Sequence, residues 1–254
     1  MRRPLIAGNW KMNGSRAMAV ALTEAMMAAS GGSGSVDVVL CPPAPYLNLV
    51  ASAAVGSALG VGAQDCSEFE SGAYTGETAA PMLRDVGCSY VIIGHSERRH
   101  VFGESDEWIN RKVKAVLAGN MKPILCIGEL LNQREAGQTE LVLKSQLEQG
   151  LAGVESLENI VIAYEPVWAI GTGVTANANQ VESAHSSVRN ILKELYPESD
   201  TIHVLYGGSV KPGNAEELIQ IPGVNGFLIG GASLDVESFA SITRTVETVQ
   251  LRTL

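Results

Sequence analysis

The chain has 254 residues, of which 46% are hydrophobic, and a formal net charge of −9 at pH 7. This length and apolar content suit one large domain, and a single α/β barrel of about 250 residues is one such domain. The negative charge argues against nucleic acid or an anionic membrane surface as a partner, and the apolar runs are too short to cross a bilayer.

Compartment and redox state can also be predicted from the sequence. The basic start Met1-Arg2-Arg3 is followed by only three apolar residues before a glycine, so it does not predict a secretory signal. The four cysteines form no C-x-x-C pair, which favours buried, reduced thiols over a zinc site or a redox pair. We therefore expect a cytoplasmic protein.

Eight short, continuously apolar runs recur along the chain, each followed by polar or glycine residues. Continuous apolar character is typical of parallel strands that are covered on both faces. The runs are Leu5–Gly8, Val36–Cys41, Gly60–Gln64, Tyr90–Gly94, Pro123–Ile127, Ile160–Tyr164, Ile202–Tyr206 and Gly226–Ile229.

The segments between these runs carry helix signals. Ser15 precedes an alanine-rich stretch that reaches Ala29, Ser105 precedes Trp108–Leu117, and Asn179–Leu195 has helical apolar spacing. No change of composition marks a second domain. Eight strand–helix repeats predict a single α/β domain over residues 1–254, a closed (β/α)8 barrel.

In such a barrel, functional residues belong at the carboxyl ends of the strands. A carboxylate, a histidine, a lysine and two glycine pairs stand at those ends and are expected to meet on one face. They are found in Asn9-Trp10-Lys11, His95-Ser96-Glu97, Glu165, Gly207-Gly208-Ser209 and Gly230-Gly231.

Glu165 is the first candidate for a catalytic group. It ends an apolar strand, and Pro166 holds its backbone out of helical geometry. The loop that follows contains Trp168 and Ile170, which could form an apolar flap. A carboxylate beside such a flap suits a general base whose pKa rises when water is expelled. A surface glutamate on an ordinary loop is the alternative.

His95 and Lys11 are the other candidates. The segment after His95 could begin a short helix, whose amino end would lower the histidine pKa and keep the imidazole neutral for proton donation. Lys11 could supply the local cation that an anionic ligand needs in this acidic chain. His95 and His100 lack a third ligand, so no metal site is predicted.

The glycine pairs after the seventh and eighth strands favour phosphate binding. Glycines allow backbone N–H groups to approach an anion, and a short helix often follows at this place in the barrel. Tight turns without a ligand are the alternative reading for either pair alone.

The stretch Gly171–Ala176 also fits a dinucleotide-binding fingerprint. It is displaced from its strand by Pro166–Ile170, and the next strand does not end in an acid, so we reject that reading.

The order and spacing of these motifs resemble the triosephosphate isomerase family, over nearly the full length of the chain. The stretch after the sixth strand is the most specific of them. The resemblance rests on Asn9-Trp10-Lys11, His95-Ser96-Glu97, Tyr164–Gly173 and Tyr206-Gly207-Gly208-Ser209.

The resemblance implies a TIM barrel that interconverts dihydroxyacetone phosphate and D-glyceraldehyde 3-phosphate, in glycolysis and gluconeogenesis, with no cofactor and no metal. Glu165 would move the proton through an enediolate, and His95 would polarise the carbonyl oxygen. Lys11 and Asn9 would hold the substrate. The backbones expected to receive its phosphate are those of Gly171, Ser209, Gly230 and Gly231.

The resemblance also implies a lid and a dimer. The loop that starts at Pro166 and carries Trp168 would close over the base, with Ile170 and Leu228 as an apolar clamp. Thr75, in a protruding loop, would approach the Lys11 and His95 of a second copy, which makes a homodimer the expected working unit.

Three residues depart from the family pattern: Val174 stands where many members have lysine, and Gly223 and Asn225 stand where many have aspartate. These departures put lid kinetics and local ion pairing in doubt. Two other functions stay open at this point: another phosphate-binding barrel enzyme, and a barrel that binds phosphometabolites without turnover.

Overall fold

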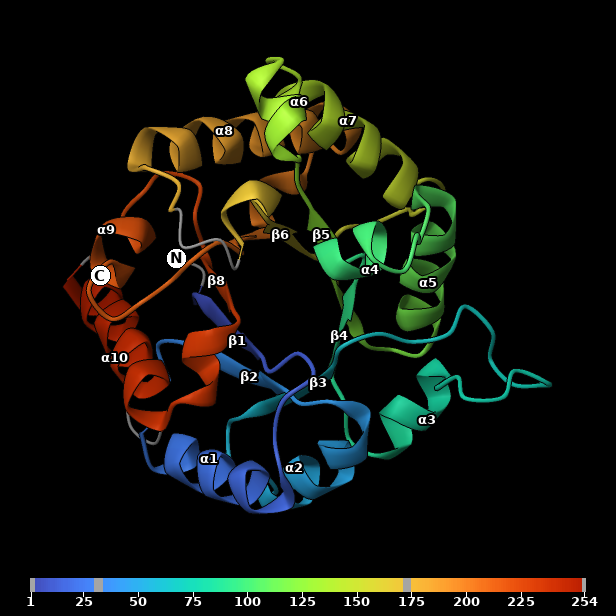
Figure 1. The fold of residues 1–254 in the computed structure, drawn as a ribbon, viewed down its shortest axis with the longest axis vertical. Coiled ribbons are helices and arrows are strands. Elements are labelled where there is room, and N and C mark those ends of the chain that lie inside the picture. Colours follow the sequence, from blue (N-terminus) through green and yellow to red (C-terminus); the bar gives the residue numbers. More distant parts are fainter. Residues whose placement is uncertain (1–2, 30–33, 171–174, 253–254) are drawn as a thin grey trace.

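The computed structural model describes residues 3–29, 34–170 and 175–252. Its strands form one closed parallel barrel in chain order, and β8 returns to pair with β1. Figure 1 looks down this barrel, with the helices in a ring around it. The strands are β1 (Leu5–Asn9), β2 (Asp37–Cys41), β3 (Gly60–Ala63), β4 (Tyr90–Ile93), β5 (Lys122–Ile127), β6 (Val161–Tyr164), β7 (His203–Tyr206) and β8 (Gly226–Ile229).

The eight predicted apolar runs are therefore all strands, and the predicted barrel class is confirmed. Strand residues alternate between two buried clusters because side chains point to opposite faces. In β1, Leu5 and Ala7 belong to a cluster contributed almost entirely by strands, whereas Ile6 belongs to the larger cluster shared with the helices. Burial on both faces explains why these runs are continuously apolar.

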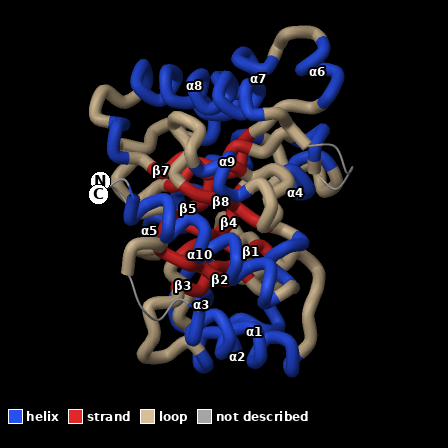
Figure 2. The backbone as a smooth tube through the Cα atoms, turned by 90° about the vertical axis from the view of Figure 1, so that its left-hand side faces the viewer, coloured by secondary structure: helices blue, strands red, loops and turns tan. Residues whose placement is uncertain are grey.

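Helices cover the outside of the barrel, which Figure 2 shows as blue segments around the red strands. None of the described helices is long and apolar enough to cross a membrane. Short 3-10 turns lie at Ala44–Tyr46, Val167–Ala169, Ser199–Thr201 and Gly231–Leu234. The α-helices are α1 (Arg16–Ala29), α2 (Leu47–Ala53), α3 (Ala80–Asp85), α4 (Ser96–His100), α5 (Asp106–Ala118), α6 (Leu131–Glu135), α7 (Thr139–Gly150), α8 (Ala178–Leu195), α9 (Ala215–Ile219) and α10 (Val236–Arg252).

Side-chain caps fix the starts of α5 and α8. The Ser105 hydroxyl accepts the Trp108 N–H at 3.2 Å and begins α5 where the sequence predicts it. At α8, Asn177 and Gln180 form a reciprocal capping box, so this helix begins one residue before the predicted Asn179.

Two predicted strands are one residue too long at their carboxyl ends. Gly94 leaves β4 because its φ is +70°, in the left-handed region that glycine adopts without strain. Gln64 lies past the end of β3, and its side-chain amide donates to the Cys41 carbonyl at the end of β2, at 2.9 Å. Both differences between the predicted and observed strand ends lie on the face that carries the predicted site.

Gly223 and Asn225, which depart from the family pattern just before β8, take part in one cluster of hydrogen bonds. This cluster lies at the face of the barrel opposite the predicted site. Gly223 has a φ of +88°, which disfavours aspartate at this position, and its carbonyl accepts from Arg189 at 3.3 Å. The side-chain oxygen of Asn225 accepts from Arg189 and, at 3.1 Å, from the Val204 N–H. A neutral amide therefore serves here as the acceptor for a guanidinium.

This cluster predicts the effect of changing Asn225. In Asn225→Ala, the Arg189 and Val204 donors lose an acceptor, so the free energy of unfolding should fall by about 1–3 kcal/mol. Asn225→Asp keeps an oxygen acceptor and serves as the matched control. Urea denaturation measures both variants. Equal stability of the alanine variant and the parent chain would show that the amide has no such role.

Candidate active site

A cavity of about 500 Å³ opens where the strands end, and most of the residues predicted from strand ends line it. Thr75 and Pro166 do not line it, and Trp168 packs behind it. Gly171, like the departure at Val174, lies outside the described residues. The predicted residues that line the cavity are Asn9, Lys11, His95, Glu165, Ile170, Ser209, Leu228, Gly230 and Gly231.

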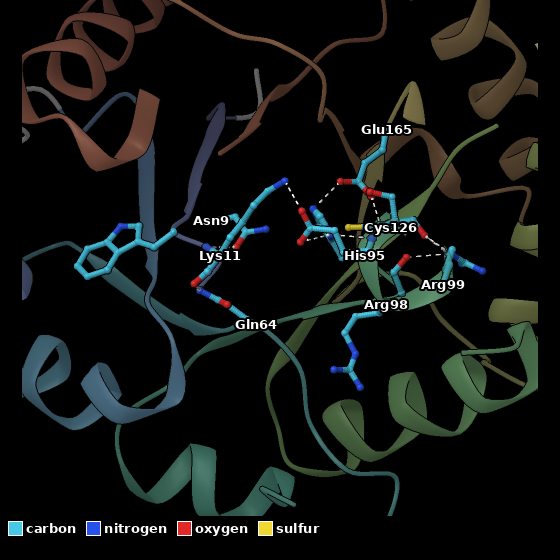
Figure 3. A network of polar contacts seen from close by, with 12 residues as sticks. Asn9, Lys11, Gln64, His95, Arg98, Arg99, Cys126 and Glu165 are labelled. Carbon is cyan, nitrogen blue, oxygen red and sulfur yellow. Dashed lines mark hydrogen bonds and ion pairs between the residues drawn. The ribbon is translucent and has the colours of Figure 1, made fainter. Parts of the chain in front are cut away.

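Glu165 lies at the buried end of this cavity, with only 2% of its surface exposed. Its backbone N–H donates to the Ile127 carbonyl at 2.7 Å, which extends the β5–β6 ladder by one bond. One carboxylate oxygen accepts the Ser96 N–H at 2.9 Å, and the other lies 2.9 Å from His95 Nε2 (Figure 3). The carboxylate is thus held at both oxygens, by groups from the end of β4.

His95 caps the amino end of α4, the short helix that the sequence predicts. Its Nδ1 accepts the Glu97 N–H at 3.3 Å. A nitrogen that accepts a hydrogen bond carries no proton, so the ring proton of the neutral imidazole is on Nε2. That N–H donates to Glu165, and the geometry places a proton donor and a carboxylate face to face.

The pKa expectation for His95 is wrong for this arrangement. Burial alone lowers the pKa of the imidazole, but the charge and hydrogen bond of the Glu165 carboxylate outweigh burial, so the pKa is raised. The sequence predicts only the effect of the helix end on the His95 pKa. The Glu165 carboxylate is in direct contact with the imidazole and has the larger effect on this pKa.

The pKa of Glu165 moves in the opposite direction. Burial raises it, but His95, the Ser96 N–H and Lys11 together hold it below the ordinary value. The rise in the Glu165 pKa that the sequence predicts from an apolar flap is therefore absent in this arrangement. The carboxylate is ionised at neutral pH, which is the state that a general base requires.

Lys11 follows β1 with a φ of +52°, a left-handed conformation that is costly for a residue with a side chain. Two hydrogen bonds hold it there. Its N–H donates to the Asn9 side chain at 3.0 Å, and its carbonyl accepts from Gln64 at 2.9 Å. The Lys11 ammonium points toward His95 and Glu165 and forms an ion pair with Glu97 at 2.6 Å (Figure 3).

The glycines after β7 leave no room for side chains, whereas those after β8 do. A Cβ on Gly207 would lie 2.9 Å from the Glu165 side chain, whereas one on Gly230 would make an ordinary contact with Lys11 at 3.4 Å. The Ser233 N–H and hydroxyl both donate to the Gly230 carbonyl, at 2.8 and 2.7 Å, and so fix the turn that begins at Gly231. These glycines therefore form part of this side of the cavity, together with residues such as Lys211 and Leu228.

The predicted lid begins with a 3-10 turn at Val167–Ala169. The indole N–H of Trp168 donates to the carboxylate of Glu129 at 3.0 Å, and the ring packs under the guanidinium of Arg134 at 5.0 Å. Glu129 is fully buried and also accepts from Tyr164 and from Arg134. The first part of the lid is therefore tied to the ends of β5 and β6.

Thr75 is exposed, in a loop between β3 and α3 that projects away from the barrel (Figure 1). The rings of Phe69 and Tyr74 stack within this loop at 4.0 Å. A second cavity, of about 370 Å³, lies between the base of the loop and the residues around Lys11 and Met12, and Met12 is 95% exposed.

The sequence alone assigns no role to several residues around the site. Gln64 and Glu129 stand at strand ends, which is the signal that could have identified them, but their partners come from neighbouring strands. The backbone N–H of Ser96 is used through geometry that no residue type reveals. Within residues 3–29, 34–170 and 175–252, no three His, Cys, Asp or Glu side chains are grouped to hold a metal ion.

The electrostatic coupling of the pair can be tested by titration. In Glu165→Gln, the carboxylate that raises the His95 pKa is lost while burial and Lys11 remain, so the imidazole should titrate at a lower pH. ¹⁵N NMR of the histidine side chains measures this midpoint. Glu97→Gln removes a smaller contribution and should give a smaller decrease. An unchanged midpoint in Glu165→Gln would contradict the coupling.

Comparisons with known proteins assign this chain to a family. A model described as triosephosphate isomerase matches residues 4–246. Triosephosphate isomerase of Rhodopirellula baltica is 51% identical over 247 residues, with 96% of this chain and 97% of that protein covered. The Hahella chejuensis enzyme is 51% identical over 243 residues, with 95% and 98% covered. The crystal structure of the Bartonella henselae enzyme matches with a TM-score of 0.89 and 39% identity, over 97% of this chain and 100% of that one. This chain belongs to the triosephosphate isomerase family.

Proposed function

We propose that Glu165 and His95 perform the isomerase reaction of this family, the interconversion of dihydroxyacetone phosphate and D-glyceraldehyde 3-phosphate in glycolysis and gluconeogenesis. The observation that carries the proposal is the 2.9 Å contact between the Glu165 carboxylate and His95 Nε2 at the buried end of the cavity. A base and a proton donor face each other there, and a glycine-lined wall completes the pocket.

In the proposed reaction, the ionised Glu165 removes a proton from the carbon next to the substrate carbonyl. The Nε2–H of His95 donates to the carbonyl oxygen, so the negative charge that develops in the enediolate is stabilised as it forms. Glu165 then returns the proton to the neighbouring carbon. The hydroxyl on that carbon gives its proton to His95 as it becomes the new carbonyl, so both side chains regain their starting protonation states. Only protons move between the enzyme and the substrate, and the scheme uses neither a cofactor nor a metal.

Lys11 and Asn9 are proposed to hold the substrate beside this pair. The chain is acidic overall, so attraction of an anionic substrate must come from local charge. Lys11 and Lys211 both line the cavity. The ion pair of Lys11 with Glu97 is partly exposed, so a substrate oxygen can compete for its ammonium. Asn9 fixes the backbone from which this ammonium extends.

The phosphate is proposed to bind the opposite wall, through the backbone N–H groups of Ser209, Gly230 and Gly231. The 3-10 turn that starts at Gly231 has its amino end at the cavity, and anions are favoured at such an end. Gly171, outside the described residues, would complete this wall by the family resemblance.

The moving part of the lid is proposed to be the segment after Trp168. Ile170 and Leu228 both line the cavity and would close as an apolar clamp over Glu165. Expulsion of water by this clamp would raise the pKa of Glu165 and protect the enediolate from side reactions. Pro166 and Trp168, held near Glu129, would be the fixed end of the movement.

A homodimer in the cytoplasm is the proposed working form. The loop that carries Thr75 projects from the barrel, and the cavity beside Lys11 and Met12 is the surface it would enter on a second copy. Exposed apolar side chains on this face support the proposal, since Met12 and Phe102 are 95% and 64% exposed in one chain.

The role of Glu165 predicts a large loss of turnover in Glu165→Gln. General-base catalysis contributes about 10²–10⁴-fold, so kcat for D-glyceraldehyde 3-phosphate should fall by about that factor. A coupled spectrophotometric assay measures it. Glu158→Gln makes the same change on an exposed loop before β6 and should keep wild-type turnover. A parent chain that binds a phosphoglycolate-type analogue without turnover would contradict the isomerase role.

The dimer proposal predicts that Thr75→Arg weakens self-association, because a long charged side chain would enter the partner's surface. Analytical ultracentrifugation over a dilution series measures the dissociation constant. Ser156→Arg places the same side chain on an exposed loop at the amino ends of the strands and should leave association unchanged. Full activity in a monomeric parent chain would exclude the contribution of Thr75 to the site.

A further inference from the structure

Arg99 lies directly behind the catalytic pair without touching either side chain. It belongs to α4, and only 7% of its side chain is exposed. Its Nε donates to the Gly94 carbonyl at 2.8 Å, and its Nη2 donates to the Cys126 carbonyl at 3.0 Å (Figure 3). One guanidinium therefore joins the carboxyl ends of β4 and β5.

The Arg99 bridge lies where β4 and β5 separate. The described pairing of β4 with β5 ends at Ile93 and Leu125. At Gly94 the left-handed φ of +70° turns the chain away from the ladder, and the Gly94 and Cys126 carbonyls lie just past its last described pair. Arg99 bonds both carbonyls at this point. A Cβ on Gly94 would lie 3.1 Å from Arg99 Nη2, so the glycine also leaves room for the bridge.

One end of the bridge lies beside His95, and the other end is linked to Glu165 through a backbone hydrogen bond. Gly94 directly precedes His95. Cys126 precedes Ile127, whose carbonyl accepts the Glu165 N–H at 2.7 Å. The Arg99 bonds thus act on the backbone frames that carry the imidazole and the carboxylate, and a shift of either strand end would change the 2.9 Å separation between them.

The shape of arginine suits this task. Its planar fork presents five donors in fixed directions, whereas the ammonium of lysine is a compact point charge. Nη1, the remaining nitrogen, donates to Asp106 in the first turn of α5 at 2.5 Å. That ion pair lies at the far edge of the guanidinium and leaves its other edge for the two carbonyls.

We propose that Arg99 is a positioning residue for the isomerase reaction, one that sets the distance between His95 and Glu165 by holding the ends of β4 and β5 together. This inference rests on the proposed roles of His95 and Glu165. It differs from a general packing role, because loss of the bridge should affect the chemical step and leave the phosphate wall on β7 and β8 intact.

The test compares Arg99→Met with Asp106→Asn. Arg99→Met keeps the apolar stem and removes both carbonyl bonds. Asp106→Asn weakens the ion pair and keeps those bonds, so it is the matched control for structural loss. The measurements are kcat and KM for D-glyceraldehyde 3-phosphate, the Kd for inorganic phosphate, the thermal midpoint, and the His95 titration followed by ¹⁵N NMR.

A displacement of about 1 Å in an active site can cost about 100-fold, so kcat of Arg99→Met should fall by about that factor. KM and the Kd for phosphate should stay close to those of the parent chain. The His95 pKa should fall in Arg99→Met, since the Glu165 charge would be farther away. Simple loss of the Arg99 positive charge would instead raise this pKa. Asp106→Asn should lower the thermal midpoint and keep kcat.

Arg99→Lys covers the case in which Arg99→Met fails to fold. It retains the charge and should show an intermediate loss of kcat with an unchanged phosphate Kd. An unchanged kcat in either Arg99 variant, or equal losses of kcat in Arg99→Met and Asp106→Asn, would overturn the proposal. The proposed function is tested separately, because retention of turnover in Glu165→Gln would remove it whatever the Arg99 variants show.

Discussion

Closure of the parallel barrel between β1 and β8 is the constraint on which the site depends. Gly226 lies at this seam, with a φ of +137° and no space for a side chain, because a Cβ would lie 1.9 Å from the Leu5 carbonyl oxygen. Once the seam closes, the end of β1 stands beside the end of β8, and Lys11 comes within reach of Gly230. The cation and the glycine wall therefore meet through strand pairing rather than through proximity in the chain.

The electrostatics of the cavity are local. The chain carries a net charge of −9, yet the cavity holds two lysines and a wall of glycine backbone. The carboxylate of Glu165 is kept ionised by a hydrogen-bonded histidine and a backbone N–H, both from the end of β4. Attraction of an anion and ionisation of a base thus coexist within one pocket, because each is set by neighbours within hydrogen-bonding distance.

The barrel and most of the candidate site could be predicted from the sequence because both follow from strand patterns. Strands buried on both faces are read as continuous apolar runs, and functional residues follow them at their carboxyl ends. Gln64 and Arg99 could not be assigned roles, since each acts on carbonyls of other segments through a side chain whose direction no pattern reveals. The predicted decrease of the His95 pKa is wrong for a related reason. The pKa depends on a contact with a carboxylate 70 residues later in the chain.

The carboxylate of Glu129 anchors the beginning of the segment after β6, and this predicts where that segment can be exchanged. Up to Ala169, the chain is bonded to that carboxylate or folded into the 3-10 turn beside it. A loop grafted from a relative would preserve the base and its strand only if the junction lies after this turn. One buried acid, rather than the glycines farther along, therefore marks the boundary for loop transplantation in this barrel.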